Sequence, residues 1–257
     1  MTTNYFWKSE KTGNNSPMVP NSIRALIVGR SGCGKTSLLM RFLLEENLLD
    51  YNKLFVFGKS LHQPEYQILK AGIENKLGKR HIVEVFKYND QINKSKDDPE
   101  TIIKAAARLI PEKDKGSISG AFFENSSKIP DPQEIDKNDK NLIIFGDIMC
   151  DKKQSAAESF YTRARHNNID CFYIAQNFYK LPRQTIRANA NFMVFFKLSK
   201  KDVDNIFHDS EASADFKNIA DFREFCNKAW LKEYGFVVID KDKRDLKERY
   251  RDRLELE

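Results

Sequence analysis

Residues 25–44 read ALIVGRSGCGKTSLLMRFLL, which is an apolar run, a glycine-rich turn and an amphipathic stretch in direct succession. The apolar run predicts a strand that is buried on both faces, and the spacing of the leucines after Lys35 predicts a helix. Residues 29–36 fit the pattern G-x-x-x-x-G-K-S/T, a loop whose backbone N–H groups surround a phosphate. A chance glycine-rich turn ahead of a helix is the alternative, but the order of strand, loop, lysine and helix favours a nucleotide site.

The expected nucleotide contacts lie in this loop and in the first turn of the following helix. Lys35 is expected to bridge the β- and γ-phosphates of ATP, and Thr36 is expected to bind Mg²⁺. Glycines let the backbone approach the phosphates without a clash, and the helix N-terminus adds the positive end of its dipole. The predicted nucleotide-binding residues are Gly29, Ser31, Gly32, Cys33, Gly34, Lys35, Thr36 and Ser37.

Two further apolar runs end in polar side chains. Residues 141–147 read NLIIFGD and residues 170–176 read DCFYIAQ. If both are parallel strands, Asp147 and Gln176 lie at the carboxyl edge of the sheet, where ligands bind in open α/β folds. Asp147 is the candidate to bind Mg²⁺ and to act on the attacking water, and the Gln176 amide is the candidate to contact the γ-phosphate. An ordinary buried strand and a turn amide are the alternatives.

Strand-like and helix-like segments alternate along the rest of the chain. This alternation predicts an α/β P-loop fold with a mostly parallel central sheet and helices on both faces. Residues 1–22 are expected to form an arm, and residues 23–257 a single domain with an insertion near 111–140. Strands are expected at 53–58, 81–86, 141–147, 170–176, 191–198 and 234–240, and helices at 64–76, 100–110, 152–166, 200–208 and 213–229.

The composition argues against several classes of protein. A hydrophobic share of 40% supplies a core and excludes a globally disordered chain. No apolar run approaches the ~18 residues of a membrane span, and the polar N-terminus does not resemble a secretory signal. Four cysteines without a C-x-x-C pair do not suggest a zinc site or a disulfide scaffold, and they fit a reducing compartment.

Much of the net charge of +6 gathers in one segment, residues 161–187, which holds five basic residues and one acid. Basic side chains contact the phosphate backbone of DNA without reading its sequence. We expect Lys180, Arg183 and Arg187 to face DNA, whereas a solvated loop or a contact between subunits is the alternative.

Together, these segments resemble the FtsK/HerA superfamily of DNA-pumping ATPases, and more closely the genome-packaging ATPases of poxviruses, virophages and Polinton/Maverick elements. The resemblance spans about residues 22–251 and rests on residues 29–37, 142–149, 162–192 and 236–251. It implies a RecA-like core that uses ATP and Mg²⁺ to translocate double-stranded DNA into a capsid. It also implies a homo-oligomeric ring of six or five subunits, a capsid or portal-vertex partner and no membrane partner. The implied location is the host cell interior, in a cytoplasmic virus factory or the nucleus, and the virion.

The resemblance also assigns roles to single residues. In related pumps an arginine just ahead of the third strand reaches the nucleotide of the neighbouring subunit; Arg165 matches it, and Arg163 is the near alternative. Asp147 matches the acid that polarises water, and Gln176 the residue that senses the γ-phosphate. Related sequences carry two acids, as in I-I-F-D-D, but the first position here is Gly146.

The missing acid leaves three interpretations open for the chemistry. Asp147 serves both roles, or Asp151 assists it, or hydrolysis is weakened. An ATP-driven packaging motor is therefore the leading hypothesis, and a nucleotide-binding assembly subunit with weak or no hydrolysis is the alternative. A small-molecule kinase is a third reading, against which the long resemblance over residues 162–192 argues.

Overall fold

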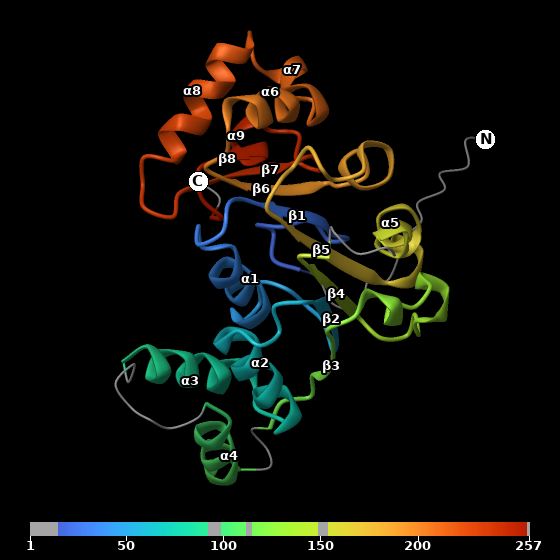
Figure 1. Ribbon diagram of the computed structural model, residues 1–257, viewed down its shortest axis with the longest axis vertical. Helices are drawn as coiled ribbons and strands as arrows, with labels where there is room; N and C mark the ends of the chain where they lie inside the picture. The colour runs from blue at the N-terminus through green and yellow to red at the C-terminus, as the bar shows by residue number, and fades with distance from the viewer. Residues whose placement is uncertain (1–14, 92–98, 112–114, 149–153, 256–257) are drawn as a thin grey trace, which may run out of the picture.

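The computed structural model describes residues 15–91, 99–111, 115–148 and 154–255, and an eight-stranded sheet lies at its centre (Figure 1). The strands from β3 to β6 in spatial order are mutually parallel, and the last two continue the sheet antiparallel. The predicted α/β class with a mostly parallel sheet is confirmed. The spatial order is β3 (Ser119–Phe123), β2 (Lys53–Gly58), β4 (Asn141–Gly146), β5 (Ile169–Ala175), β1 (Arg24–Val28), β6 (Phe192–Phe196), β7 (Phe236–Asp240) and β8 (Tyr250–Arg251).

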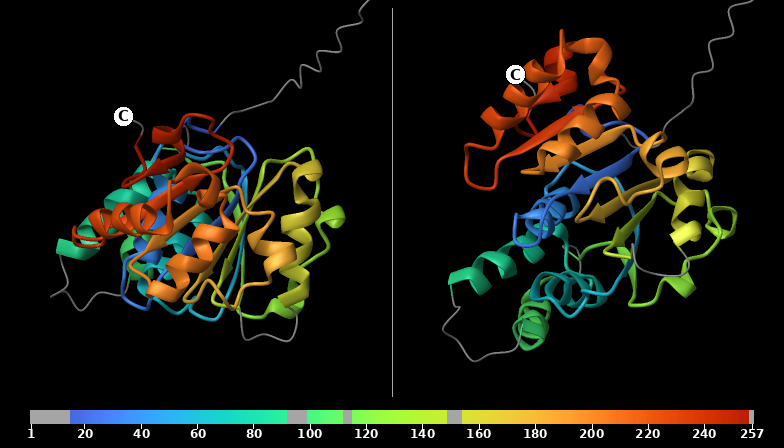
Figure 2. Two further views of the ribbon diagram at one scale, coloured as in Figure 1. Left: turned by 90° about the horizontal axis from the view of Figure 1, so that it is seen from above. Right: turned by 45° about the horizontal axis from the view of Figure 1, so that its top comes forward.

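Helices cover both faces of this sheet, and α1 and α5 lie on opposite sides of it (Figures 1 and 2). One face packs against α1 (Lys35–Leu44) and α2 (Pro64–Glu74), and α3 (Lys79–Gln91) and α4 (Pro99–Leu109) pack on α2 at the same side. The other packs against α5 (Gln154–Arg163), α6 (Lys200–Asp209), α7 (Ala212–Asp215) and α8 (Ile219–Ala229). Shorter elements are α9 (Leu246–Arg249), the 3₁₀ turns η2 (Ser126–Lys128), η3 (Pro132–Glu134) and η4 (Ala164–Asn167), and the π-helical turn η5 (Arg183–Arg187). Within the described ranges, no helix has the length and apolar character needed to span a bilayer.

The central strands are buried on both faces, as their continuous apolar runs predict. In β1, Ala25 and Ile27 belong to the core under α1, whereas Leu26 and Val28 belong to the core under α5. Successive side chains of a strand point to opposite faces, so one run fills both cores.

The strand predicted at 81–86 is wrong, because these residues lie within the helix α3. Ile82 and Val85 are buried at helical spacing. A short apolar run fits a buried strand as well as a helix, so its periodicity did not decide between them. The contact with α2 is close: a β-carbon on Gly72 would lie 2.7 Å from Ile82 Cγ1.

The segment predicted as an insertion contains an ordered edge strand, β3, which pairs in parallel with β2. Phe123 stacks on Phe57 with ring centroids 5.0 Å apart, so this part of the segment docks on the body. In the predicted arm, Asn15 and Val19 are buried, and residues 1–14 lie outside the described residues. The proposed domain boundaries stay a prediction.

Candidate nucleotide-binding site

The predicted phosphate loop joins β1 to α1 at the carboxyl edge of the parallel strands. Gly34 has a φ of 99° at the start of α1, a left-handed conformation that favours glycine. Gly29 lies against β6, where a β-carbon would come within 2.7 Å of Phe196 Cβ. Its N–H donates to the Ala175 carbonyl over 3.1 Å, which ties the loop to β5. These contacts explain why the pattern needs glycines at both positions.

Lys35 is held against its own loop. Its Nζ donates to the Gly29 carbonyl over 2.7 Å and to the Arg30 carbonyl over 2.6 Å. Burial lowers the pKa of this ammonium, and the charges of Cys33 and Asp147 oppose that shift. A triphosphate that entered the cavity would compete with the two carbonyl oxygens for the ammonium group.

Asp147 and Gln176 are brought together, as their place at neighbouring strand ends predicts. The β5 strand lies between β1 and β4, so the residues that follow these three strands are adjacent. Asp147 adopts a left-handed φ of 54°, which an aspartate tolerates better than most side chains. The Gln176 Nε2 donates to Asp147 Oδ2 over 3.3 Å.

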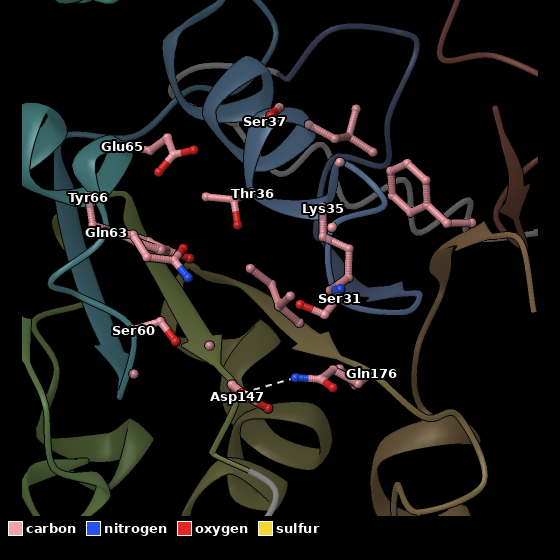
Figure 3. A pocket seen from close by; sticks show the side chains of 18 of the residues that line it. Ser31, Lys35, Thr36, Ser37, Ser60, Gln63, Glu65, Tyr66, Asp147 and Gln176 are labelled. Atoms are coloured by element: carbon pink, nitrogen blue, oxygen red, sulfur yellow. Dashed lines mark hydrogen bonds between the residues drawn. The ribbon is translucent and has the colours of Figure 1, made fainter. Parts of the chain in front are cut away.

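One cavity of about 760 Å³ connects these groups, within the size range of small-molecule sites. Figure 3 shows Lys35 and Thr36 on one side of it and Asp147 with Gln176 on another. Its lining from the loop and α1 includes Ser31, Gly32, Gly34, Lys35, Thr36 and Ser37, and its lining from the ends of β4 and β5 includes Gly146, Asp147 and Gln176. Gly29 and Cys33, also predicted as nucleotide contacts, shape the loop behind this lining.

The cavity has a second wall that sequence reasoning missed, at the junction of β2 and α2. Ser60, Gln63, Glu65 and Tyr66 line it. Tyr66 is buried, and burial together with the Glu65 charge raises its pKa to about 12, so its hydroxyl stays protonated. No motif marks these residues; the only signal would have been the pairing of β2 with β4, which sequence alone does not give.

An aromatic wall at the opposite end of the cavity was also missed. It consists of Phe196, Tyr234 and Phe236. Tyr234 is 63% exposed, and its ring Cδ1 would lie 3.3 Å from a β-carbon on Gly34. Arg41 also lines the cavity, but its guanidinium pairs with Glu45 at 2.6 Å and with Glu255 at 2.5 Å.

The glycine in place of the expected first acid is not imposed by the fold. A β-carbon on Gly146 would lie 3.6 Å from the Tyr66 hydroxyl, which is an ordinary contact, and the backbone there is not left-handed. Its neighbour in the sheet differs, since a β-carbon on Gly58 would lie 2.7 Å from the Gly146 carbonyl oxygen. Position 146 therefore has room for a side chain. Asp151, the other candidate acid, lies outside the described residues.

The basic segment separates into exposed and buried arginines. Lys180 is exposed, and so is Arg183, although its Nε donates to Asp209 over 3.1 Å. Arg187 is 7% exposed, pairs with Asp209 at 2.5 Å and lies over the Phe178 ring. Because this guanidinium is not accessible to a phosphate backbone, Arg187 is not among the DNA contacts proposed below.

The two candidates for the arginine that acts in trans lie at the end of α5. Arg163 is exposed and pairs with Asp131 at 2.6 Å. Arg165 lies in η4, and its side chain is outside the described part of the chain. The geometry does not choose between them.

The family model of the Poxvirus A32 protein matches residues 121–244. The match contains Asp147, Gln176 and the basic segment 161–187, and it confirms the resemblance to the poxvirus packaging ATPases. No protein of curated function matches the sequence.

Solved structures of similar fold include two viral packaging proteins. The genome-packaging NTPase B204 of Sulfolobus turreted icosahedral virus 2, in complex with AMPPCP, has 11% identity and a TM-score of 0.49, over 87% of this chain and 95% of that one. B204 of Sulfolobus turreted icosahedral virus, described as the DNA-packaging ATPase, has 14% identity and a TM-score of 0.47, over 87% and 94%. VirB4 of Thermoanaerobacter pseudethanolicus has 10% identity and a TM-score of 0.45, over 86% and 87%.

Proposed function

We propose that this chain, a relative of the viral genome-packaging ATPases to which the Poxvirus A32 family model points, hydrolyses ATP and couples hydrolysis to the movement of double-stranded DNA into a capsid. The observation that carries the proposal is the convergence of Lys35, Asp147 and Gln176 on one cavity at the carboxyl edge of a parallel sheet. This edge is where open α/β sheets bind their ligands.

The chain's own residues account for the steps at the γ-phosphate. Lys35 exchanges its two loop carbonyls for phosphate oxygens, Asp147 orients the attacking water, and Gln176 fixes the Asp147 carboxylate and reports the γ-phosphate. Arg165, or Arg163, stabilises the developing charge from a neighbouring subunit. This role requires a neighbouring subunit, and the proposed assembly is a homo-oligomeric ring of six or five subunits.

Mg²⁺ fits the donors that the cavity offers. The Thr36 hydroxyl and the Asp147 carboxylate supply oxygen ligands, which this hard cation prefers. When bound, the ion would neutralise charge on the phosphates. Among the described residues, no group of three or more His, Cys, Asp or Glu side chains could hold a metal by itself.

The two ends of the cavity differ in a way that would fix the orientation of a bound nucleotide. The γ-phosphate end faces Asp147 and Gln176, beyond β5 from the loop. The opposite end leads past Gly34 to the aromatic wall, where Tyr234 offers an exposed ring for stacking on the nucleobase.

The proposed DNA contacts are Lys180 and Arg183, which are exposed on the segment after Gln176. Because this segment follows directly from the γ-phosphate sensor, the state of the nucleotide can be transmitted to it. The partners proposed with DNA are a capsid or portal-vertex protein, and the proposed location is the host cell interior and the virion.

ATP turnover with and without long duplex DNA tests the proposal. We expect DNA to stimulate turnover, and we expect Lys35→Ala and Arg165→Ala to abolish the stimulated rate. Mixing the two inactive variants should restore part of the activity if the arginine acts in trans. DNA-independent turnover, or normal stimulated turnover in Lys35→Ala, would contradict the motor.

Gly146 favours a second candidate function, a nucleotide-binding assembly subunit with little or no hydrolysis. Because position 146 has room for a side chain, Gly146→Asp is a sound test of this alternative, with Gly146→Ala as the matched control. A large gain of turnover in the aspartate variant alone would favour a crippled site. Equal turnover in all three proteins would favour an intact one.

A further inference from the structure

The cavity contains a carboxylate to which no motif had assigned a role. Two acids, Asp147 and Glu65, belong to its described lining. Glu65, Thr36 and Ser37 all line the cavity, and Figure 3 shows the Glu65 carboxylate turned toward its interior. It therefore faces the nucleotide site from the wall opposite β5.

The topology explains how Glu65 reaches this place. The β2 strand pairs with β4 so that Gly58 lies next to Gly146, and the chain then turns into α2, which begins at Pro64. The second residue of α2 is Glu65. Sequence-distant residues thus meet where two neighbouring parallel strands end.

Glu65 and position 146 border the same part of the cavity. A β-carbon on Gly146 would lie 3.6 Å from the Tyr66 hydroxyl, and the charge of Glu65 acts on that same hydroxyl. Glu65 and position 146 therefore flank Tyr66, and both belong to the wall of the cavity that β2, α2 and β4 form.

The Glu65 charge is not compensated within the part of the chain that the structure describes, where we find neither an ion pair nor a hydrogen bond of its carboxylate. By contrast, Arg41, which also lines the cavity, pairs with both Glu45 and Glu255. An unpaired carboxylate on the wall of a cavity that the Thr36 hydroxyl also lines offers hard oxygen ligands for a divalent cation or for its bound water.

We propose that Glu65 supplies, from α2, the acid that is missing at position 146, and that it holds Mg²⁺–ATP on the Thr36 side of the cavity. The inference rests on the proposed nucleotide site, but it does not require hydrolysis or DNA. A purely structural role is the competing explanation: α2 lacks a side-chain cap, and an acid in its first turn stabilises the helix dipole.

The test measures how strongly Mg²⁺ tightens the binding of AMPPCP. Calorimetric titrations with and without Mg²⁺ give two dissociation constants, and their ratio is the Mg²⁺ factor. In Glu65→Gln one ligand of the ion is weakened, and one charge that repels the free triphosphate is removed. Both effects lower the factor, and we expect a drop of roughly tenfold or more.

Two further variants make the result specific. Glu74→Gln, in the last turn of the same helix and outside the cavity lining, should keep the wild-type factor. Adding Gly146→Asp to Glu65→Gln should recover the factor at least in part, because it returns a carboxylate to the same wall of the cavity. A structural role would instead lower thermal stability and change both dissociation constants alike.

An unchanged Mg²⁺ factor in Glu65→Gln would overturn the inference, and so would the lack of any recovery in the double variant. Failure of the proposed motor would look different. In that case wild-type protein would bind AMPPCP in a Mg²⁺-dependent way but would show no DNA-stimulated turnover, and the Glu65 effect would persist.

Discussion

The Gln176 side chain donates a hydrogen bond of 3.3 Å to the Asp147 carboxylate, and this bond joins the residues that follow β5 and β4. Neither residue contacts the phosphate loop through a hydrogen bond within the described part of the chain. In the proposed function, this pair acts on the far end of a bound triphosphate, while Lys35 and the loop hold it.

From this arrangement we expect Gln176→Ala to separate binding from turnover. Affinity for AMPPCP should change little, because the loop contacts remain, whereas the rate of ATP hydrolysis should fall by roughly 100-fold, the usual cost of one preorganised donor. Asn177→Ala is the matched control, since Asn177 bonds to the Lys180 amide and does not line the cavity. A parallel loss of binding and turnover would contradict the sensor role.

Tyr234 is expected to bind the nucleobase by stacking. Replacing Tyr234 with Ala should weaken ATP binding by about 1–3 kcal/mol, the range measured for stacking of bases on aromatic side chains. Binding of inorganic tripolyphosphate, which has no base, should be unchanged, and Tyr234→Phe should keep most of the affinity. Leu231→Ala, an exposed residue of the same loop, serves as the control. Equal weakening for both ligands would place the defect in the phosphate loop.

The sequence predicted those parts of the site whose residues are contiguous. The loop at 29–36 and the strands that end before Asp147 and Gln176 carry their own local signals, and the parallel sheet follows from their alternation with helices. Glu65 and Tyr234 carry no such signal, because they reach the cavity only through the pairing of β2 with β4 and of β6 with β7.

Tertiary contacts that the local sequence does not reveal also explain a wrong prediction at residues 81–86 and the strand β3, which was not predicted. The run at 81–86 is apolar enough for a strand, but it lies in the helix α3, where Ile82 packs closely against Gly72 of α2. The glycine-containing strand β3 is short and lies at the edge of the sheet, so its neighbour β2 determines it more than its own composition does.

Arg183 and Arg187 bind the same carboxylate, Asp209, but should respond differently to substitution. Arg187→Ala leaves a buried acid without its close partner and should lower the free energy of unfolding by about 3 kcal/mol. Arg183→Ala removes an exposed pair and should cost less than ~1 kcal/mol. Urea unfolding measures both.

For DNA binding we expect the opposite ranking of the two variants, with the larger effect in Arg183→Ala. Arg183→Ala should weaken binding to duplex DNA of any sequence and reduce the slope of log affinity against log salt by about 1. Folded Arg187→Ala, studied below its unfolding transition, should keep the wild-type slope. A reduced slope in Arg187→Ala alone would return Arg187 to the DNA surface and remove Arg183 from it.

Asp170 makes folding stability depend on pH. Asp170 is partly buried at the start of β5, where its carboxylate accepts hydrogen bonds from the Ile23 amide at 2.7 Å and from Asn15 Nδ2 at 3.0 Å. Burial outweighs these bonds and raises the pKa of Asp170 from 3.8 to about 6. The folded state therefore holds this proton more tightly than the unfolded state does. Its stabilising contribution is complete below pH ~4 and is lost as the pH rises through 6.

This shift in the pKa of Asp170 corresponds to about 3 kcal/mol of unfolding free energy between a pH well below 3.8 and a pH well above 6. Asp170→Asn is neutral at every pH and can still accept the Ile23 hydrogen bond through Oδ1. Relative to the wild type, the variant should therefore gain about 2.5 kcal/mol of unfolding free energy between pH 4 and pH 7.5, because the unfolded carboxyl is already partly ionised at pH 4 and the titrations of all other groups cancel in the difference. Urea unfolding of both proteins at the two pH values measures it. A difference that stays constant with pH would mean that water reaches the carboxylate and that the N-terminal segment does not seal it.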